Sequence, residues 1–477
     1  TDLTNHGGKI TQYGASPMTI SVSNRFDNSV GGTLQTNSTD LTLAPGTLVN
    51  DGGAITHAGT GTLTLAPSSG TGAISNVAGK ITSAGQIGAN AGSLNNAQGV
   101  LAAKRDITAT AAGEVNNVQG QMRALSSLSL HNGGTLTNTS GRIQSGTGAS
   151  NGADTLDVQS ASIDNSVGLI GNLGAGATTV QGGSELVNRN GTVTGNGEVT
   201  VVASSITNTQ GGQLSGSNLK VLGDTLDNSG GTIGNVANGD VKVTTTGAIT
   251  NTNGRIGATH DLSVNASTLT GGGTYSAAND VAMNLQGNFA ATPDVQFNAG
   301  HDLAFTLSGT FTNSTGLQAV NNLSVDAGDI VNSGSIAAGN LLRTHSNTLT
   351  NTGAMVGGSV SLAADSTLSN LGPTALIGAS DSNGTLELLS HDIENRDDTT
   401  ATDTQAQTAI VGLGKVILAG GKDANGNYTN AALIRNQSAL IQSGGDMALH
   451  ADQVTNTRRA MKTSGYTRNV DPALLEQ

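Results

Sequence analysis

Residues 206–226 indicate the fold of this chain most clearly. They are Ile206-Thr207-Asn208-Thr209-Gln210-Gly211-Gly212-Gln213-Leu214-Ser215-Gly216-Ser217-Asn218-Leu219-Lys220-Val221-Leu222-Gly223-Asp224-Thr225-Leu226. Gly, Ser and Asn divide this segment into three short apolar stretches. An Asn follows Ile206 by two residues, and the same pairing returns roughly every 20 residues along the whole chain. A fixed short period of this kind predicts a solenoid in which one supersecondary unit forms each coil.

The Asn residues of the repeat share one phase, because each follows a branched or aromatic apolar residue by two. Side chains two apart on a strand face the same way, so we expect each Asn to point inward at a strand end. There its amide can satisfy the turn backbone and stack on the Asn of the next coil. A row of ligand-binding amides is the alternative, but a buried column is not accessible. We therefore predict a structural ladder of Asn138, Asn165, Asn188, Asn208, Asn228, Asn251, Asn313, Asn332, Asn351 and Asn370.

The strands of each coil show a period of two. Leu219-Lys220-Val221 and Leu386-Glu387-Leu388 each place a charge between two apolar residues, so the charge faces water and its neighbours face inward. Gly pairs such as Gly211-Gly212 stand where the chain turns, since glycine tolerates positive φ and close backbone approach. The sequence therefore predicts an all-β parallel β-helix of about 20 coils, each of roughly 20 residues with three short strands.

The composition agrees with a narrow, folded rod. Only 2% of the 477 residues are aromatic, so Leu, Ile and Val must fill the core, and 35% hydrophobic with 11% charged residues argues against disorder. The chain has no cysteine, which excludes disulfides, thiol catalysis and Cys-ligated zinc. The net charge of −13 disfavours binding to nucleic acid. We predict no cofactor.

Departures from the period divide the chain. We expect a β-helical rod over residues 1–457, with insertions near 45–70, 146–155 and 396–430, and an exit segment over 458–477. The last insertion reads as a hairpin that turns at Asn425-Gly426 and protrudes from the rod. In the exit segment, Asp471 and Pro472 are typical of a helix start.

Two groups of residues are candidates for a partner surface. Five of the nine aromatic residues gather within 269–311, where the Asn repeat lapses. They either form an internal stack that fills a wider core or a partner-binding patch. The acidic insertion and its hairpin are the second group. The candidate surface comprises Tyr275, Phe289, Phe297, Phe305, Phe311, Asp397, Asp398 and Tyr428.

Motifs with catalytic or metal-binding potential are weak in this sequence. His260-Asp261 and His301-Asp302 precede strands at a position that elsewhere holds Arg or Asn before Asp, which indicates a turn. Asp397, Asp398 and Asp403 could resemble the paired carboxylates of a glycan hydrolase, but a solvated acidic loop explains them as well. Asp423 begins an alternating oxygen pattern typical of calcium loops, without the closing Glu. We predict no catalytic, cofactor-binding or metal-binding residue.

The repeat as a whole resembles a known family. The pattern Leu-x-Asn-x-x-Gly-x-Ile, seen from Leu136 to Ile143 and with Ile at its first position from Ile249 to Ile256, is similar to the haemagglutinin repeat of filamentous haemagglutinin and CdiA-type exoproteins. The resemblance covers nearly the whole chain. It implies a right-handed parallel β-helix, secretion to the cell surface of a Gram-negative bacterium, and export by an outer-membrane two-partner secretion transporter through a domain absent from these residues.

The resemblance also implies the function. Members of this family adhere to surfaces or carry a toxin toward a neighbouring bacterium, so we expect a non-enzymatic stalk, an interior segment that projects receptor-binding and toxin modules in contact-dependent growth inhibition. The cell-surface receptor of a neighbouring bacterium or host cell is the implied partner. A direct adhesin of the haemagglutinin type is the alternative, and a β-helical glycan hydrolase or lyase is a remote one.

Overall fold

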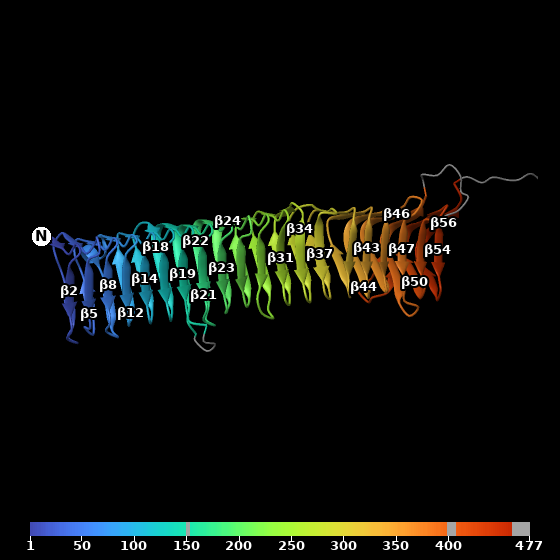
Figure 1. The fold of residues 1–477 in the computed structure, drawn as a ribbon. Coiled ribbons are helices and arrows are strands. Elements are labelled where there is room, and N and C mark those ends of the chain that lie inside the picture. The colour runs from blue at the N-terminus through green and yellow to red at the C-terminus, as the bar shows by residue number, and fades with distance from the viewer. Residues whose placement is uncertain (149–152, 398–406, 460–477) are drawn as a thin grey trace, which may run out of the picture. The chain divides into compact units, whose positions relative to one another are not determined.

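The computed structural model describes residues 1–148, 153–397 and 407–459, which form two compact units, Thr1–Gly309 (unit 1) and Thr310–Gln477 (unit 2). Parallel strands stack coil upon coil within each unit (Figure 1). About 21 turns of parallel β-solenoid make up the chain, and about 1% of the residues are helical. The predicted all-β parallel solenoid is therefore confirmed.

Each coil of unit 1 contributes one strand to a separate sheet, here called the first face. Its described strands form an uninterrupted parallel sheet of 14. In order they are β2 (Lys9–Gln12), β5 (Thr33–Thr36), β8 (Ala54–His57), β11 (Lys80–Ser83), β14 (Val100–Ala103), β17 (Gln121–Ala124), β19 (Arg142–Ser145), β21 (Leu169–Asn172), β23 (Thr192–Gly195), β25 (Gln213–Gly216), β28 (Thr232–Asn235), β31 (Gly254–Ala258), β34 (Gly273–Ala277) and β37 (Val295–Ala299).

Two further strands complete a coil and define the second and third faces. After β25 the chain forms β26 (Leu219–Gly223) on the second face and β27 (Thr225–Asp227) on the third. In some coils the two strands are continuous, as in β18 (Leu128–Thr137), β20 (Leu156–Asp164), β22 (Thr178–Val187) and β24 (Val199–Thr207). A register shift bends such strands at the corner, for example between Asn132 and Thr135. Each coil therefore has three strand segments, as the period predicts.

The core is a set of apolar columns that run from coil to coil. In the coil quoted above, Leu214, Leu219, Val221 and Leu226 are buried, while Lys220 between them is exposed. Equivalent residues pair in neighbouring coils, so that Leu226 lies beside the next branched side chain of its column. Burial of these side chains stabilises the fold by about 1.5–3 kcal/mol each. Each coil is therefore stabilised by its contacts with its neighbours.

Unit 2 repeats this plan. Its first face is formed by β40 (Gly316–Ala319), β43 (Ser335–Ala338), β45 (Ala354–Gly357), β47 (Leu376–Ala379), β49 (Ala409–Gly412) and β54 (Leu440–Ser443). Long strands cover the other two faces, namely β44 (Leu341–Asn351), β46 (Ser359–Leu371) and β48 (Thr385–Arg396). They are followed by β50 (Lys415–Ala419), β53 (Ala431–Gln437), β55 (Met447–Leu449) and β56 (Ala451–Thr457).

Two of the segments predicted as insertions contain an element that is not a solenoid strand. The first contains the 3-10 helix η1 (Pro67–Gly70). The third contains an antiparallel hairpin of β51 (Gly421–Lys422) and β52 (Tyr428–Thr429), so the hairpin expected at Asn425-Gly426 is confirmed. Gly426 has the positive φ of 81° that such a turn requires. Part of the second insertion (149–152) and the helix expected at Asp471 lie outside the described residues.

Candidate functional site

The Asn residues of the repeat form a buried column in each unit. Asn138 Nδ2 donates to Asn165 Oδ1 at 2.7 Å and to the backbone oxygen of Leu169 at 3.2 Å. Equivalent amide-to-amide bonds of 2.7–2.8 Å join the Asn residues of unit 1, and bonds of 2.7–3.0 Å join those of unit 2. In unit 1 the buried members are Asn5, Asn28, Asn50, Asn76, Asn96, Asn117, Asn138, Asn165, Asn188, Asn208, Asn228 and Asn251, and in unit 2 they are Asn313, Asn332, Asn351, Asn370, Asn395 and Asn436. Asn436 donates in turn to Asn456, which is exposed.

Glycines of the repeat are needed because the column leaves no room for a side chain. A Cβ on Gly141 would lie 2.1 Å from the Asn117 oxygen and 2.5 Å from Asn138 Oδ1. Contacts this short do not occur with real Cβ atoms, so the Asn-x-x-Gly spacing is a direct consequence of the ladder.

The five aromatic residues that the candidate partner surface takes from 269–311 lie in the core. Tyr275 and Phe297 stack at 5.4 Å between ring centroids, and Phe289 and Phe305 stack at 5.7 Å. All four side chains are at most 9% exposed, and Phe311 of unit 2 is fully buried. The prediction of a partner patch here is therefore wrong, because the rings occupy inward positions that branched aliphatic residues hold in other coils. The internal stack is the correct interpretation.

The acidic members of that surface are no more accessible where they are described. Asp397 is 6% exposed, and its backbone oxygen accepts a hydrogen bond from Arg459 Nη1 at 2.7 Å. Burial removes Asp397 from an exposed surface, so this part of the prediction is also wrong. Asp398 and Asp403 lie outside the described residues.

Tyr428 anchors the hairpin to the second face of unit 2. Its hydroxyl donates to Glu387 Oε1 at 2.7 Å, and Lys422 Nζ lies 2.6 Å from the same oxygen. The Tyr428 ring stacks on His450 at 5.4 Å. Burial alone would raise the pKa of Glu387, but the bonds from Lys422 and Tyr428 hold it below its usual range. The hairpin is thus held by a charged, partly buried cluster.

The oxygen pattern at the hairpin tip forms a turn. Asp423 Oδ1 accepts hydrogen bonds from the backbone N–H groups of Asn425 and Asn427, at 2.9 and 2.8 Å. The bond from Asn427 lowers the pKa of Asp423. This carboxylate is therefore engaged by its own backbone, which is the ordinary role of Asp in a turn.

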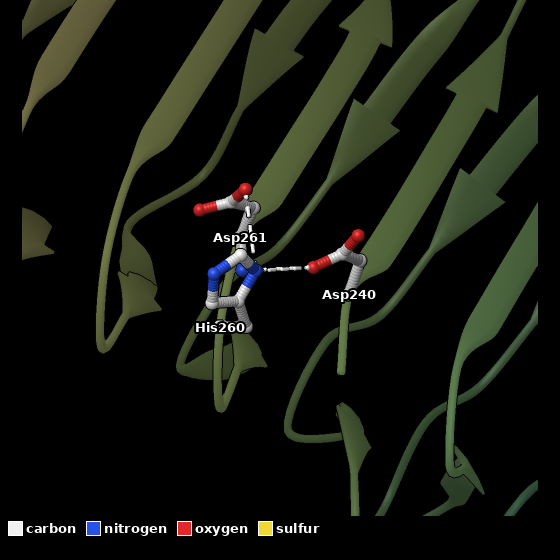
Figure 2. Close-up of side chains that lie close together, drawn as sticks. All are labelled: Asp240, His260 and Asp261. Atoms are coloured by element: carbon white, nitrogen blue, oxygen red, sulfur yellow. Dashed lines mark hydrogen bonds and ion pairs between the residues drawn. The ribbon is translucent and has the colours of Figure 1, made fainter. Parts of the chain in front are cut away.

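A cluster at the start of the second face of unit 1 combines His260 and Asp261, which the sequence assigns to a turn, with Asp240, which sequence analysis missed. Asp240 and Asp261 precede β29 (Val241–Thr245) and β32 (Leu262–Ala266), and His260 Nδ1 lies 2.8 Å from Asp240 Oδ1 and 3.3 Å from Asp261 Oδ2 (Figure 2). The hydrogen bond between His260 and Asp240 raises the pKa of His260 and lowers that of Asp240. The two carboxylates are about one repeat apart in sequence, and this spacing is the pattern that could have revealed the cluster.

The same arrangement recurs two coils later. His301 Nδ1 lies 3.1 Å from Asp280 Oδ1 and 3.2 Å from Asp302 Oδ1. The ligand atoms within each set are close enough to share a metal ion. However, Asp240 Oδ1 already accepts the N–H of Asp261, and Asp280 Oδ1 accepts that of Asp302, at 3.2 and 3.0 Å. These carboxylates cap the backbone of the next coil, which agrees with the turn role predicted from sequence.

Comparison with known proteins shows that the chain is similar to segments of CdiA proteins and spans a small part of their length. No protein-family model and no solved structure matches it. The "tRNA nuclease CdiA-2" of Burkholderia pseudomallei (strain 1026b) is 60% identical over 485 residues, which cover 100% of this chain and 16% of that protein. The "Toxin CdiA" of Yersinia pestis is 45% identical over 208 residues, which cover 40% of this chain and 6% of that protein. In the described ranges, no helix is long and apolar enough to cross a membrane.

Proposed function

We propose, from the premise that this chain belongs to the CdiA family, that it is a segment of the stalk of such an exoprotein. In this role the coils hold modules of the complete protein at a distance from the cell. The segment acts through its length and stiffness.

The observation that carries this proposal is the continuity of each Asn column. A hydrogen bond joins every coil of a column to the next, and the turn glycines close around it, so neighbouring coils have little freedom to separate. Strand spacing gives each coil a rise of about 4.8 Å. Stacked in this way, coils add length in fixed steps, as a spacer requires.

We further propose that the segment is not an enzyme. The name "tRNA nuclease" belongs to a relative of which this chain spans 16%. The carboxylates that the structure brings together, such as Asp240 and Asp280, accept backbone N–H groups of the following coil. A glycan hydrolase would instead need two carboxyl groups free to face a sugar bond.

Export and location follow from the same homology. We expect the complete protein to be secreted or displayed on the surface of a Gram-negative bacterium, after passage through an outer-membrane two-partner secretion transporter. We expect its receptor to be on a neighbouring cell. These partners would contact the complete exoprotein, of which the present chain is a part.

Whole-coil deletions in the full-length exoprotein test the stalk proposal. Removal of residues 209–228 joins Asn208 to Ser229 and restores the repeat one coil shorter, and removal of 166–228 joins Asn165 to Ser229 three coils shorter. Three coils correspond to about 15 Å of a much longer protein. We expect both variants to reach the cell surface and to retain delivery of the toxin to neighbouring cells. Loss of delivery by a variant still displayed at normal levels would refute the spacer role.

A further inference from the structure

The first face of unit 1 has an unusual charge distribution for an acidic protein. Its 14 described strands contain no Asp or Glu, although the chain carries a net charge of −13. The acidic strand residues of unit 1 lie on the other two faces, at Asp27, Asp157, Asp164, Glu185 and Asp227. The basic residues of the first face are Lys9, Lys80, Arg123, Arg142 and Arg255.

Three cations gather around two adjoining grooves on this face. One groove, of about 420 Å³, is lined by Lys104 and Arg123, and its wall includes Leu125 and several alanines. The other, of about 340 Å³, is lined by Arg123 and Arg142 together with glutamines. Arg123 is common to both. Neither groove has an acidic lining residue among those that the structure describes.

The cations of the grooves are available to an anionic ligand. Lys104 and Arg123 are exposed, and their side chains pair with no carboxylate in the described part of the chain. Arg142 Nε donates to Gln144 Oε1 at 2.9 Å, a bond that orients its guanidinium group along the face. Arg123 and Arg142 lie on adjacent first-face strands, β17 and β19, which are separated by about 4.8 Å. The nearest acidic residue in sequence, Asp106, accepts the N–H of Ser127 at 3.1 Å.

We propose that these two grooves bind an acidic polysaccharide whose charge is carried by uronate carboxylates. Guanidinium groups match carboxylates in geometry and can bond them bidentately. Glutamine amides can bond sugar hydroxyls, and the apolar wall of the first groove suits the carbon face of a sugar ring. No aromatic residue lines either groove, so the stacking platforms typical of single-stranded nucleic acid sites are lacking in these described coils. Three successive coils carry one cation each, and the strand register shifts Arg123 by two residues from Lys104 and Arg142 by two residues from Arg123, so the cations form a diagonal line that suits an extended polymer.

Binding of polygalacturonate to the purified chain tests this inference. The groove variant is Lys104→Gln/Arg123→Gln/Arg142→Gln. The matched control is Arg189→Gln/Lys220→Gln/Lys242→Gln, which removes the same number of charges away from the first face. Loss of three charge-assisted contacts should weaken binding by at least about tenfold, and the control should stay within about twofold. Affinity should also fall as salt concentration rises.

Two further ligands distinguish recognition of uronate carboxylates from non-specific binding of a polymer or of negative charge. Neutral dextran should not bind, and dextran sulfate should bind more weakly than polygalacturonate if carboxylate geometry is recognised. No binding of polygalacturonate, equal loss in both triple variants, or equal or tighter binding of dextran sulfate would overturn the proposal. Preferential binding of vesicles with anionic phospholipid would overturn it in favour of a membrane surface. The stalk proposal is tested separately, because the deletion of residues 209–228 removes no residue that lines either groove.

Discussion

The two units build the same Asn column with different turns. In unit 1 the turn Asn138-Thr139-Ser140-Gly141 is closed by a bond from Gly141 N to Asn138 O at 2.9 Å, and Ser140 adopts a left-handed φ of 54°. In unit 2 the turn at Asn332 is one residue shorter, so that Gly334 follows Asn332 by two residues. There Asn332 O accepts instead from Thr352 N of the next coil, at 2.7 Å.

This difference shows which part of the repeat is essential. The longer turn requires a left-handed residue. Among the described residues, nine non-glycine residues fill this position in unit 1, two residues after a column Asn, and Ser438 fills it in unit 2. The amide bond that each residue donates along its column is nevertheless 2.7 Å at both Asn138 and Asn332. The ladder is therefore constant, and the turn is the variable solution that connects it to the first face.

Removal of one Asn should have the largest effect, and a similar one in both units. Asn208→Ala removes the donor to Asn228 Oδ1 and to the backbone oxygen of Thr232, and it removes one of the three acceptors of Asn188 Nδ2. Buried polar groups left unpaired should lower the free energy of unfolding by about 3 kcal/mol, measured by urea denaturation. Asn332→Ala should cost about the same, and Asn298→Ala, on the exposed side of β37, should cost little. A large difference between the first two would mean that the turn contributes more than the column.

Turn glycines should come next. Gly141→Ala introduces a Cβ against the ladder, and Gly334→Ala introduces one 2.1 Å from the Thr315 oxygen. Each should lower the free energy of unfolding by about 2 kcal/mol, since the backbone must shift. Gly316→Ala is the matched control, because its Cβ would meet nothing within 4 Å. A substitution at Gly141 as mild as this control would argue against close packing around the column.

Replacement of a β-branched residue that adopts the left-handed conformation should stabilise unit 1 slightly. Val167 has a φ of 58° and is 57% exposed, which is costly for a β-branched residue. Val167→Asn should raise the free energy of unfolding by about 1 kcal/mol, because Asn tolerates this conformation. The position after Asn332 in the shorter turn offers no such gain, so Ser333→Asn should be neutral. Equal effects at both sites would show that the left-handed conformation is not strained.

The smallest effect concerns pH. The pKa of His260 is raised in the folded protein, so His260 binds its proton more tightly there than in the unfolded chain. The resulting stability is present below the ordinary histidine pKa of about 6.5 and is lost as pH rises through the raised value. Asp240→Asn should lower the titration midpoint of His260 measured by NMR. Asp106→Asn is the control and should leave that midpoint unchanged. An unchanged midpoint in Asp240→Asn would exclude the hydrogen bond as its cause.

Much of the fold could be predicted from the sequence because each coil repeats the same local rules. The two-residue offset between Ile206 and Asn208 determines that both side chains face inward, and the Gly positions follow from the turns. The sequence leaves the aromatic segment ambiguous, because the spacing of its Phe residues is compatible both with an internal stack in a wider core and with an exposed patch. Only the register of Tyr275 on Ile256 and Phe297 resolves it.

The clusters between coils could not be predicted in the same way. Contact between His260 and Asp240 depends on the exact coil length, because an insertion of one residue would place the carboxylate elsewhere. The basic grooves could be predicted only if the face on which each strand lies were known, and the net charge of the chain does not give this information. The spacing of apolar residues therefore predicts the columns inside the solenoid. Contacts between side chains on its surface can be predicted only when the register of neighbouring coils is known.

Deletion of a single coil from the purified chain tests the central claim most directly, namely that the Asn column sets the repeat. Circular dichroism and urea denaturation should show that the chain without residues 209–228 keeps its strand content and a cooperative transition, because Asn208 takes the place of Asn228. The chain without residues 209–218, which breaks the phase, should lose stability by several times the effect of the whole-coil deletion. Equal damage from both deletions would contradict the account.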